Sequence, residues 1–327
     1  MASLGKALVI VFGVLFLIFL SLSINTIFTL SSITADSGNS EPVDYHFAFF
    51  LPQESHSFFH LVALGAKEAA REFDCALSFH SVGKDTVDLE MARFSGIDGA
   101  VLYPSIDENE ARRIVEQLSD SGISVVLIEH ALSDESPRPL VGTNNFVMGK
   151  EIGELIANRS RNPLQVAVVY SRKSPGIYAE KDLVGLGITS SLGNLLEAPL
   201  WTKVTGLNPL DAEQLTYSML RNEPWISTVV FSDTSDTLAA TQVLIDMNLV
   251  GTVQLIGFGA EDTILDYVDK GILEATVVTN PRKIGYSAVS VLMDMQQYGY
   301  SSGYVDTGSS IVTRENVEAF RKAGRRQ

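Results

Sequence analysis

Polar residues follow two apolar runs of the chain, at positions where a binding or catalytic site is expected. Glu129 and His130 come directly after the run 123–128, and Pro104 and Ser105 come after the run 96–103. A carboxylate accepts hydrogen bonds, whereas a neutral imidazole can donate or accept one. Glu129 and His130 therefore suit a polar ligand, although solvated loop residues would also explain this position.

The sequence lacks the motifs of common catalytic sites. It contains no Gly-x-Ser-x-Gly, no His-Glu-x-x-His and no phosphate-binding loop. Five histidines are scattered along the chain, and the single cysteine, Cys75, excludes an internal disulfide and a cysteine-based zinc site. We predict no catalytic residues, no metal and no cofactor, and a hydrolytic enzyme is only a distant alternative.

The elements that must position Glu129 and His130 form one strand-helix-strand unit over residues 96–132. Ser105 and Glu108 have the spacing of a capping box, which predicts the start of the helix. The helix then has one apolar stripe, formed by Ala111, Ile114, Val115 and Leu118. Such a unit is right-handed with parallel strands, so the residues after its strands open onto a crevice.

Strands and helices alternate along most of the 327 residues, which predicts an α/β fold of two Rossmann-like, doubly wound lobes. The expected N-terminal lobe comprises residues 44–143 plus about 280–304, and the C-terminal lobe comprises 144–279 plus about 305–320. A long helix is expected over residues 178–196. The chain would cross between the lobes more than once, which makes a multi-strand hinge.

The N-terminal segment predicts a membrane anchor. Residues 7–35 contain no charged side chain, and an apolar stretch of this length can cross a bilayer. We expect a short cytoplasmic N-terminus (1–6), a transmembrane helix (7–30), a flexible tether (31–43) and an extracytoplasmic domain; a cleaved signal peptide, giving a secreted protein, is the alternative. The net charge of −15 argues against a nucleic-acid partner.

Several stretches, in order along residues 44–320, resemble the type I periplasmic solute-binding proteins, the family of ribose- and galactose-binding proteins. They are Phe58-Phe59, residues 98–105 (DGAVLYPS), residues 141–150 (VGTNNFVMGK), residues 256–258 (IGF), and residues 305–308 (VDTG) with 312–316 (VTREN). The resemblance implies that two lobes close over a small molecule. It also implies a membrane partner, either an ABC-type permease for uptake or a sensor kinase for signalling.

The resemblance also implies the ligand-binding residues. In the family, aromatic rings at the positions of Phe58 and Phe59 stack on a sugar, although core packing is the alternative for both. Turn geometry is the alternative for Asn145, and helix capping for Ser235 and Asp236. The full predicted set is His56, Phe58, Phe59, Glu129, His130, Asn145, Glu180, Ser235, Asp236, Phe258 and Thr279.

The chain departs from the family pattern at three of its ligand positions. Glu180 stands near the place where many sugar binders carry an arginine, Gly259 replaces an aspartate, and Thr279 replaces a glutamine. Exchanging arginine for glutamate removes a fork of donors and reverses the charge. An acidic crevice with Glu129 and Glu180 disfavours anions and leaves open a neutral polyol, an amino sugar or a cationic solute.

Overall fold

The computed structural model describes residues 19–21, 23, 45–52, 57–82, 86–132, 138–159, 164–208 and 210–324. The predicted transmembrane helix (7–30), apart from 19–21 and 23, the predicted tether (31–43) and His56 lie outside the described residues. No helix in the described ranges is long and apolar enough to cross a membrane. The chain divides into two compact units, 1–44 and 45–327, and all that follows concerns the second.

The first sheet of this unit is built mainly from the N-terminal half of the chain. Its six strands are all parallel and lie in the order β11-β5-β4-β3-β1-β2. They are β1 (His46–Pro52), β2 (Ala76–Val82), β3 (Gly99–Leu102), β4 (Ser124–Ile128), β5 (Leu140–Gly142) and β11 (Tyr304–Asp306). Continuous apolar runs form these strands because both faces of the sheet are covered.

Helices cover both faces of the first sheet. On one face, α2 (Ser57–Phe73) and α11 (Pro281–Tyr298) pack on the sheet and build one apolar core. On the other face, α3 (Val87–Met91) and α4 (Glu108–Asp120) build a second core. The predicted apolar stripe of α4 is buried as expected.

The second sheet also has six strands, in the order β12-β10-β9-β8-β6-β7, and only β12 runs antiparallel to its neighbour. The strands are β6 (Val166–Ser171), β7 (Trp201–Thr205), β8 (Thr228–Phe231), β9 (Gln254–Phe258), β10 (Ala275–Thr279) and β12 (Ser309–Thr313). These two mostly parallel sheets confirm the predicted α/β fold with two lobes.

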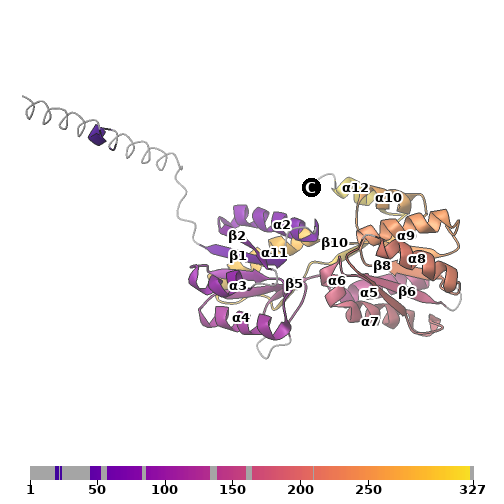
Figure 1. Ribbon diagram of the computed structural model, residues 1–327, viewed down its shortest axis with the longest axis horizontal. Helices are drawn as coiled ribbons and strands as arrows, with labels where there is room; N and C mark the ends of the chain where they lie inside the picture. The colour runs from indigo at the N-terminus through magenta and orange to yellow at the C-terminus, as the bar shows by residue number, and fades with distance from the viewer. Residues whose placement is uncertain are drawn as a thin grey trace, which may run out of the picture. The chain divides into compact units, whose positions relative to one another are not determined.

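Helices also cover both faces of the second sheet (Figure 1). One face carries α5 (Asn145–Arg159), α6 (Pro175–Ala179) and α7 (Lys181–Leu192). The other carries α8 (Asp211–Asn222), α9 (Thr234–Asp246), α10 (Asp262–Asp269) and α12 (Val317–Gly324). The cores of the two sheets consist of different residues, so each lobe is stabilised by its own apolar packing.

The chain passes between the two sheets three times, after β5, between β10 and α11, and between β11 and β12. Two of these crossings are hydrogen-bonded to each other: Thr307 N donates to Gly142 O at 2.9 Å, and Asn144 N donates to Asp306 Oδ1 at 3.1 Å. The crossing segments therefore lie side by side.

Although α2 and α11 are far apart in sequence, they are neighbours in the structure (Figure 1). A Cβ atom added to Gly65 would lie 1.8 Å from Arg282 O, and one added to Gly285 would lie 1.8 Å from Val62 O. Only glycine allows this approach, because a side chain at either position would collide with the backbone of the partner helix.

Two local predictions are wrong. The N-cap of α4 is Asp107 and not Ser105, because the Asp107 carboxylate accepts hydrogen bonds from Asn109 N (3.0 Å) and Glu110 N (3.3 Å). The helix expected over residues 178–196 is interrupted at Glu180, where the backbone leaves helical geometry, and α7 ends at Leu192. Apolar spacing is the same on both sides of this break, so periodicity alone does not reveal it.

Candidate ligand-binding site

Glu129 lies at the carboxyl end of β4, where its side chain is held by the first crossing segment. Its Oε1 atom accepts hydrogen bonds from Thr143 N (3.0 Å) and Thr143 Oγ1 (3.3 Å). The residue is 5% exposed, and its backbone φ of +63° is left-handed, a conformation that costs free energy for a residue with a side chain. The surroundings thus hold Glu129 in one orientation.

The environment of Glu129 favours its protonated form. Burial raises the pKa of this carboxyl group to about 7; the hydrogen bonds from Thr143 oppose the shift, and the charge of Glu180 adds to it. On its other side, a Cβ atom at Gly176 would lie only 2.1 Å from Glu129 Oε2. The carboxyl group of Glu129, which belongs to the first lobe, therefore packs directly on helix α6 of the second lobe.

His130 and Glu180 form an ion pair between the two lobes. His130 Nδ1 lies 2.6 Å from Glu180 Oε1, and both side chains are partly buried. The hydrogen bond with Glu180 raises the pKa of His130, and burial opposes this shift. Since Glu180 occupies the break between α6 and α7, the break places its carboxylate opposite the end of β4.

Three aromatic side chains lie near this cluster. Phe58 and Phe59, at the start of α2, meet edge to face at 5.1 Å, and Phe59 meets Tyr103 in the same way at 5.1 Å. Phe59 is 1% exposed and belongs to the core, whereas Phe58 is only partly buried. Phe58 is therefore the better placed of the two for contact with a ligand.

Tyr103 is a member of this cluster that we did not predict from the sequence. Burial raises the pKa of its hydroxyl group, and the charges of Glu129 and Glu180 add to the shift, so the tyrosine is close to both carboxylates. The sequence feature that could have indicated Tyr103 is its position at the end of the apolar run 96–103, directly before Pro104.

Two buried polar atoms at the crossings lack hydrogen-bond partners in the described part of the chain. They are Asn145 Oδ1 and Thr307 Oγ1, on residues that are 3% and 4% exposed. Thr307 is hydrogen-bonded through its backbone to Gly142, where an added Cβ atom would lie 3.3 Å from Glu129 Oε1. Sequence reasoning identified Asn145 but not Thr307. Both oxygen atoms can accept a hydrogen bond from a polar group.

On the side of the second lobe, Asp236 is engaged by its neighbours. Its Oδ1 atom lies 2.6 Å from Lys173 Nζ, and its Oδ2 atom accepts a hydrogen bond from Thr205 Oγ1 at 2.5 Å. The N-cap of α9 is Asp233, which accepts a hydrogen bond from Asp236 N, so neither Ser235 nor Asp236 is the cap. Burial raises the pKa of Asp233.

The remaining predicted residues lie at strand and helix ends of the second lobe. Ser235 is exposed on the first turn of α9, Phe258 is partly buried at the end of β9, and Thr279 ends β10 opposite Ser309. In the described ranges, none of these three has a hydrogen bond or ion pair with Glu129, His130 or Glu180. The described residues also include no group of three or more acidic, histidine or cysteine side chains that suits a metal ion.

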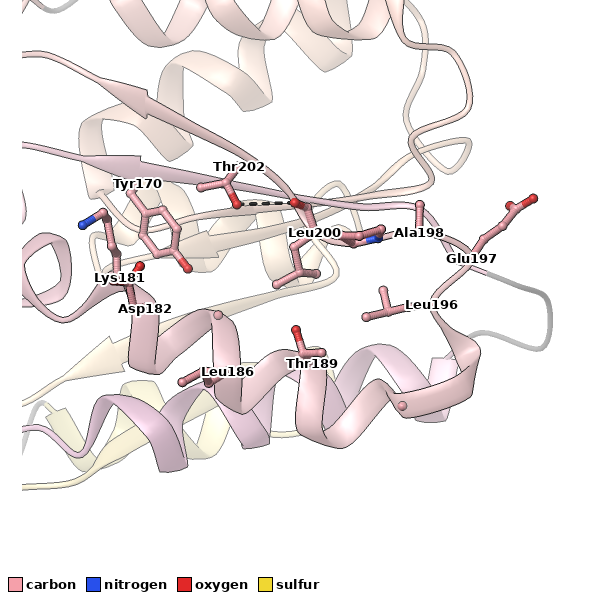
Figure 2. A pocket seen from close by; sticks show the side chains of 13 residues that line it. Tyr170, Lys181, Asp182, Leu186, Thr189, Leu196, Glu197, Ala198, Leu200 and Thr202 are labelled. Carbon is pink, nitrogen blue, oxygen red and sulfur yellow. Dashed lines mark hydrogen bonds between the residues drawn. The ribbon is translucent and has the colours of Figure 1, made fainter.

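A separate groove of about 710 Å³ lies on the second lobe, between α7 and the edge strand β7. Figure 2 shows Leu200 and Thr202 on one side and Leu186 and Thr189 of α7 on the other. No predicted ligand-binding residue lines it. Beside this groove, α7 packs closely on α5, where a Cβ atom added to Gly187 would lie 2.2 Å from Phe146 O, and three of the five residues of β7 are exposed.

Comparison with known proteins identifies the fold. A family model described as a periplasmic binding protein domain matches residues 47–300. No curated protein sequence matches the chain.

Solved structures with the same fold include three bacterial proteins. A glucose-galactose binding protein from Geobacillus stearothermophilus is 21% identical with a TM-score of 0.69, covering 83% of this chain and 98% of its own. A periplasmic ribose ABC transporter protein from Conexibacter woesei is 17% identical with a TM-score of 0.73, covering 87% and 97%.

A Caulobacter myo-inositol binding protein, solved with myo-inositol, is 17% identical with a TM-score of 0.74, covering 86% of this chain and 97% of its own. With two α/β lobes, three crossings and a family match over residues 47–300, this chain belongs to the periplasmic binding protein domain family.

Proposed function

We propose that this chain is a membrane-anchored, extracytoplasmic solute-binding protein that closes its two lobes over a sugar-like molecule for uptake by an ABC-type permease. The observation that carries the proposal is the pair His130–Glu180, which joins side chains of the two lobes at 2.6 Å beside the crossing segments. A site divided between two lobes can respond to a ligand by closing, because the ligand contacts both halves only in the closed form.

The character of the site supports binding rather than catalysis. It combines hydrogen-bonding groups, such as Glu129, His130 and Asn145, with the aromatic ring of Phe58. Such a combination suits a molecule with hydroxyl groups and an apolar ring face. The similarity to binding proteins for glucose or galactose and for myo-inositol supports a sugar or polyol as the ligand.

A thermal unfolding screen tests the proposal. The full-length chain is purified in a detergent without a sugar headgroup and is heated with single sugars, polyols and amino sugars. At ~100 times the dissociation constant, a true ligand contributes about 2.7 kcal/mol to stability and raises the melting temperature. Amino acids and nucleosides serve as controls. No shift with any sugar-like compound would contradict the proposal.

The anchor and the partner require separate tests. Retention of residues 1–30 in the mature protein, measured by mass spectrometry of the membrane fraction, supports an anchor, whereas loss of this segment supports a secreted protein. Permease and ATPase genes beside this gene support uptake, whereas a histidine kinase gene supports the sensing alternative. Turnover of a bound compound would contradict the expectation of a non-enzymatic protein.

A further inference from the structure

We propose that the ligand is an amino sugar or aminocyclitol, whose protonated amine binds Glu129 and Glu180 and replaces His130 as the partner of Glu180. This inference rests on the proposed function and specifies its ligand class. It follows from three observations: two carboxyl groups at one helix, cationic groups already engaged elsewhere, and unpartnered polar atoms nearby.

The two carboxyl groups converge on α6. Glu129 Oε2 packs against Gly176. A Cβ atom added to this glycine would lie only 2.1 Å from the oxygen. Glu180 lies one helical turn further on, where its backbone N donates to Gly176 O at 3.3 Å. Two carboxyl groups from opposite lobes are thus held beside one turn of helix. A positively charged group beside them would be attracted by Glu180 and would favour the ionised form of Glu129.

The neighbouring cationic side chains have partners of their own in the described part of the chain. Lys173 is paired with Asp236, and Lys283 Nζ donates to Thr307 O at 3.2 Å. Lys181 Nζ lies 5.4 Å from the ring centre of Tyr178. His130 is the partner of Glu180 among the described residues, and a protonated amine that displaced His130 would take over this pairing.

The unpartnered atoms also call for a ligand with several donors. Asn145 Oδ1 can only accept hydrogen bonds, and Thr307 Oγ1 can accept as well as donate. An ammonium group carries three donors and no acceptor, whereas a hydroxyl group carries one donor. The ring of Phe58 suits the apolar face of a sugar or cyclitol, which favours an amine on such a ring over a simple polyamine.

Isothermal titration with the full-length chain tests the inference at neutral pH in the same detergent. The probes are glucosamine, galactosamine and an aminocyclitol, each compared with its hydroxyl counterpart and, for glucosamine, with the neutral N-acetyl derivative. We expect at least one amine to bind about tenfold more tightly than its hydroxyl counterpart, because a charged hydrogen bond exceeds a neutral one.

Variants of the pair separate ligand recognition from a structural role. Glu180→Gln keeps the shape of the side chain and should remove the preference for the amine. His130→Asn removes the competing partner of Glu180 and should strengthen amine binding. Both variants break the same ion pair, so a purely structural role would change affinity in the same direction. Glu116→Gln, at an exposed position of α4, is the matched control and should change neither affinity.

The outcomes distinguish the two proposals. If a neutral sugar binds as tightly as its amine counterpart, or more tightly, the amine inference is wrong and the proposed function stands. If no sugar, cyclitol or amine binds, both proposals are wrong. Melting curves without ligand establish that each variant is folded, and a variant that fails this test is replaced by Glu129→Gln.

Discussion

Lys173 Nζ lies 2.6 Å from Asp236 Oδ1, and the side chain of Asp236 is only 1% exposed. Lys173 lies just after β6, and Asp236 lies in the first turn of α9, so the two residues come from separate segments of the second lobe. A charge in such a place is tolerated because it is paired and hydrogen-bonded, here also to Thr205 Oγ1. The pair links the segment after β6, which leads into α6 and Glu180, to the first turn of α9.

Removing one member of this pair should destabilise the protein strongly. Lys173→Met leaves the carboxylate of Asp236 buried without its cation, and we expect a loss of about 3–5 kcal/mol in the free energy of unfolding, measured by urea denaturation. Glu68→Gln, which breaks the exposed ion pair with Arg282, is the control and should leave the urea midpoint unchanged. Equal effects of the two variants would contradict the expected role of burial.

Glu129 should make the protein less stable as the pH rises. Its folded pKa is raised from 4.5 to about 7, so the folded state binds the proton more tightly than the unfolded state does. Its contribution is present below pH 4.5 and is lost as the pH rises through about 7. The difference corresponds to a change on the order of 3 kcal/mol.

Glu129→Gln lacks this titration and keeps an acceptor for Thr143. Melting temperatures measured across this pH range should therefore fall less steeply for the variant than for the wild type. Parallel curves for the two proteins would show that Glu129 is not buried as described.

The pair His130–Glu180 should contribute to stability mainly at pH values at which His130 is protonated. The folded pKa of His130 is raised above 6.5, so the contribution is fully present below pH 6.5 and is lost as the pH rises through the folded value. Both side chains are partly exposed, and we expect about 1 kcal/mol or less. The melting temperatures of wild type and Glu180→Gln should therefore converge at higher pH; a constant difference would contradict an electrostatic role.

Gly285 should not tolerate a side chain. Gly285→Ala places a Cβ atom 1.8 Å from Val62 O, so α11 must move away from α2. We expect a loss of about 1–3 kcal/mol in stability, as is typical of overpacked sites, measured by thermal unfolding. Ser287→Ala, two residues further along the same helix, is a control for helix propensity and should have a small effect. Unchanged stability of Gly285→Ala would show that the helices are further apart.

Much of the fold follows from local sequence patterns. Continuous apolar runs such as 124–128 predict strands covered on both faces, and the stripe of α4 predicts a helix that packs on them. The three-residue strands β5 and β11 are too short to show any periodicity. Their pairing depends on contacts between segments more than 160 residues apart, which a local pattern does not contain.

Hydrophobic periodicity is a local property, and it is enough to predict two α/β lobes and to place Glu129 and His130 after a buried strand. The break in the helix at Glu180, its ion pair with His130 and the positions of Tyr103 and Thr307 are seen only in the folded structure. These features arise from contacts between distant segments, whose distances and burial are fixed when the two sheets and their crossings assemble.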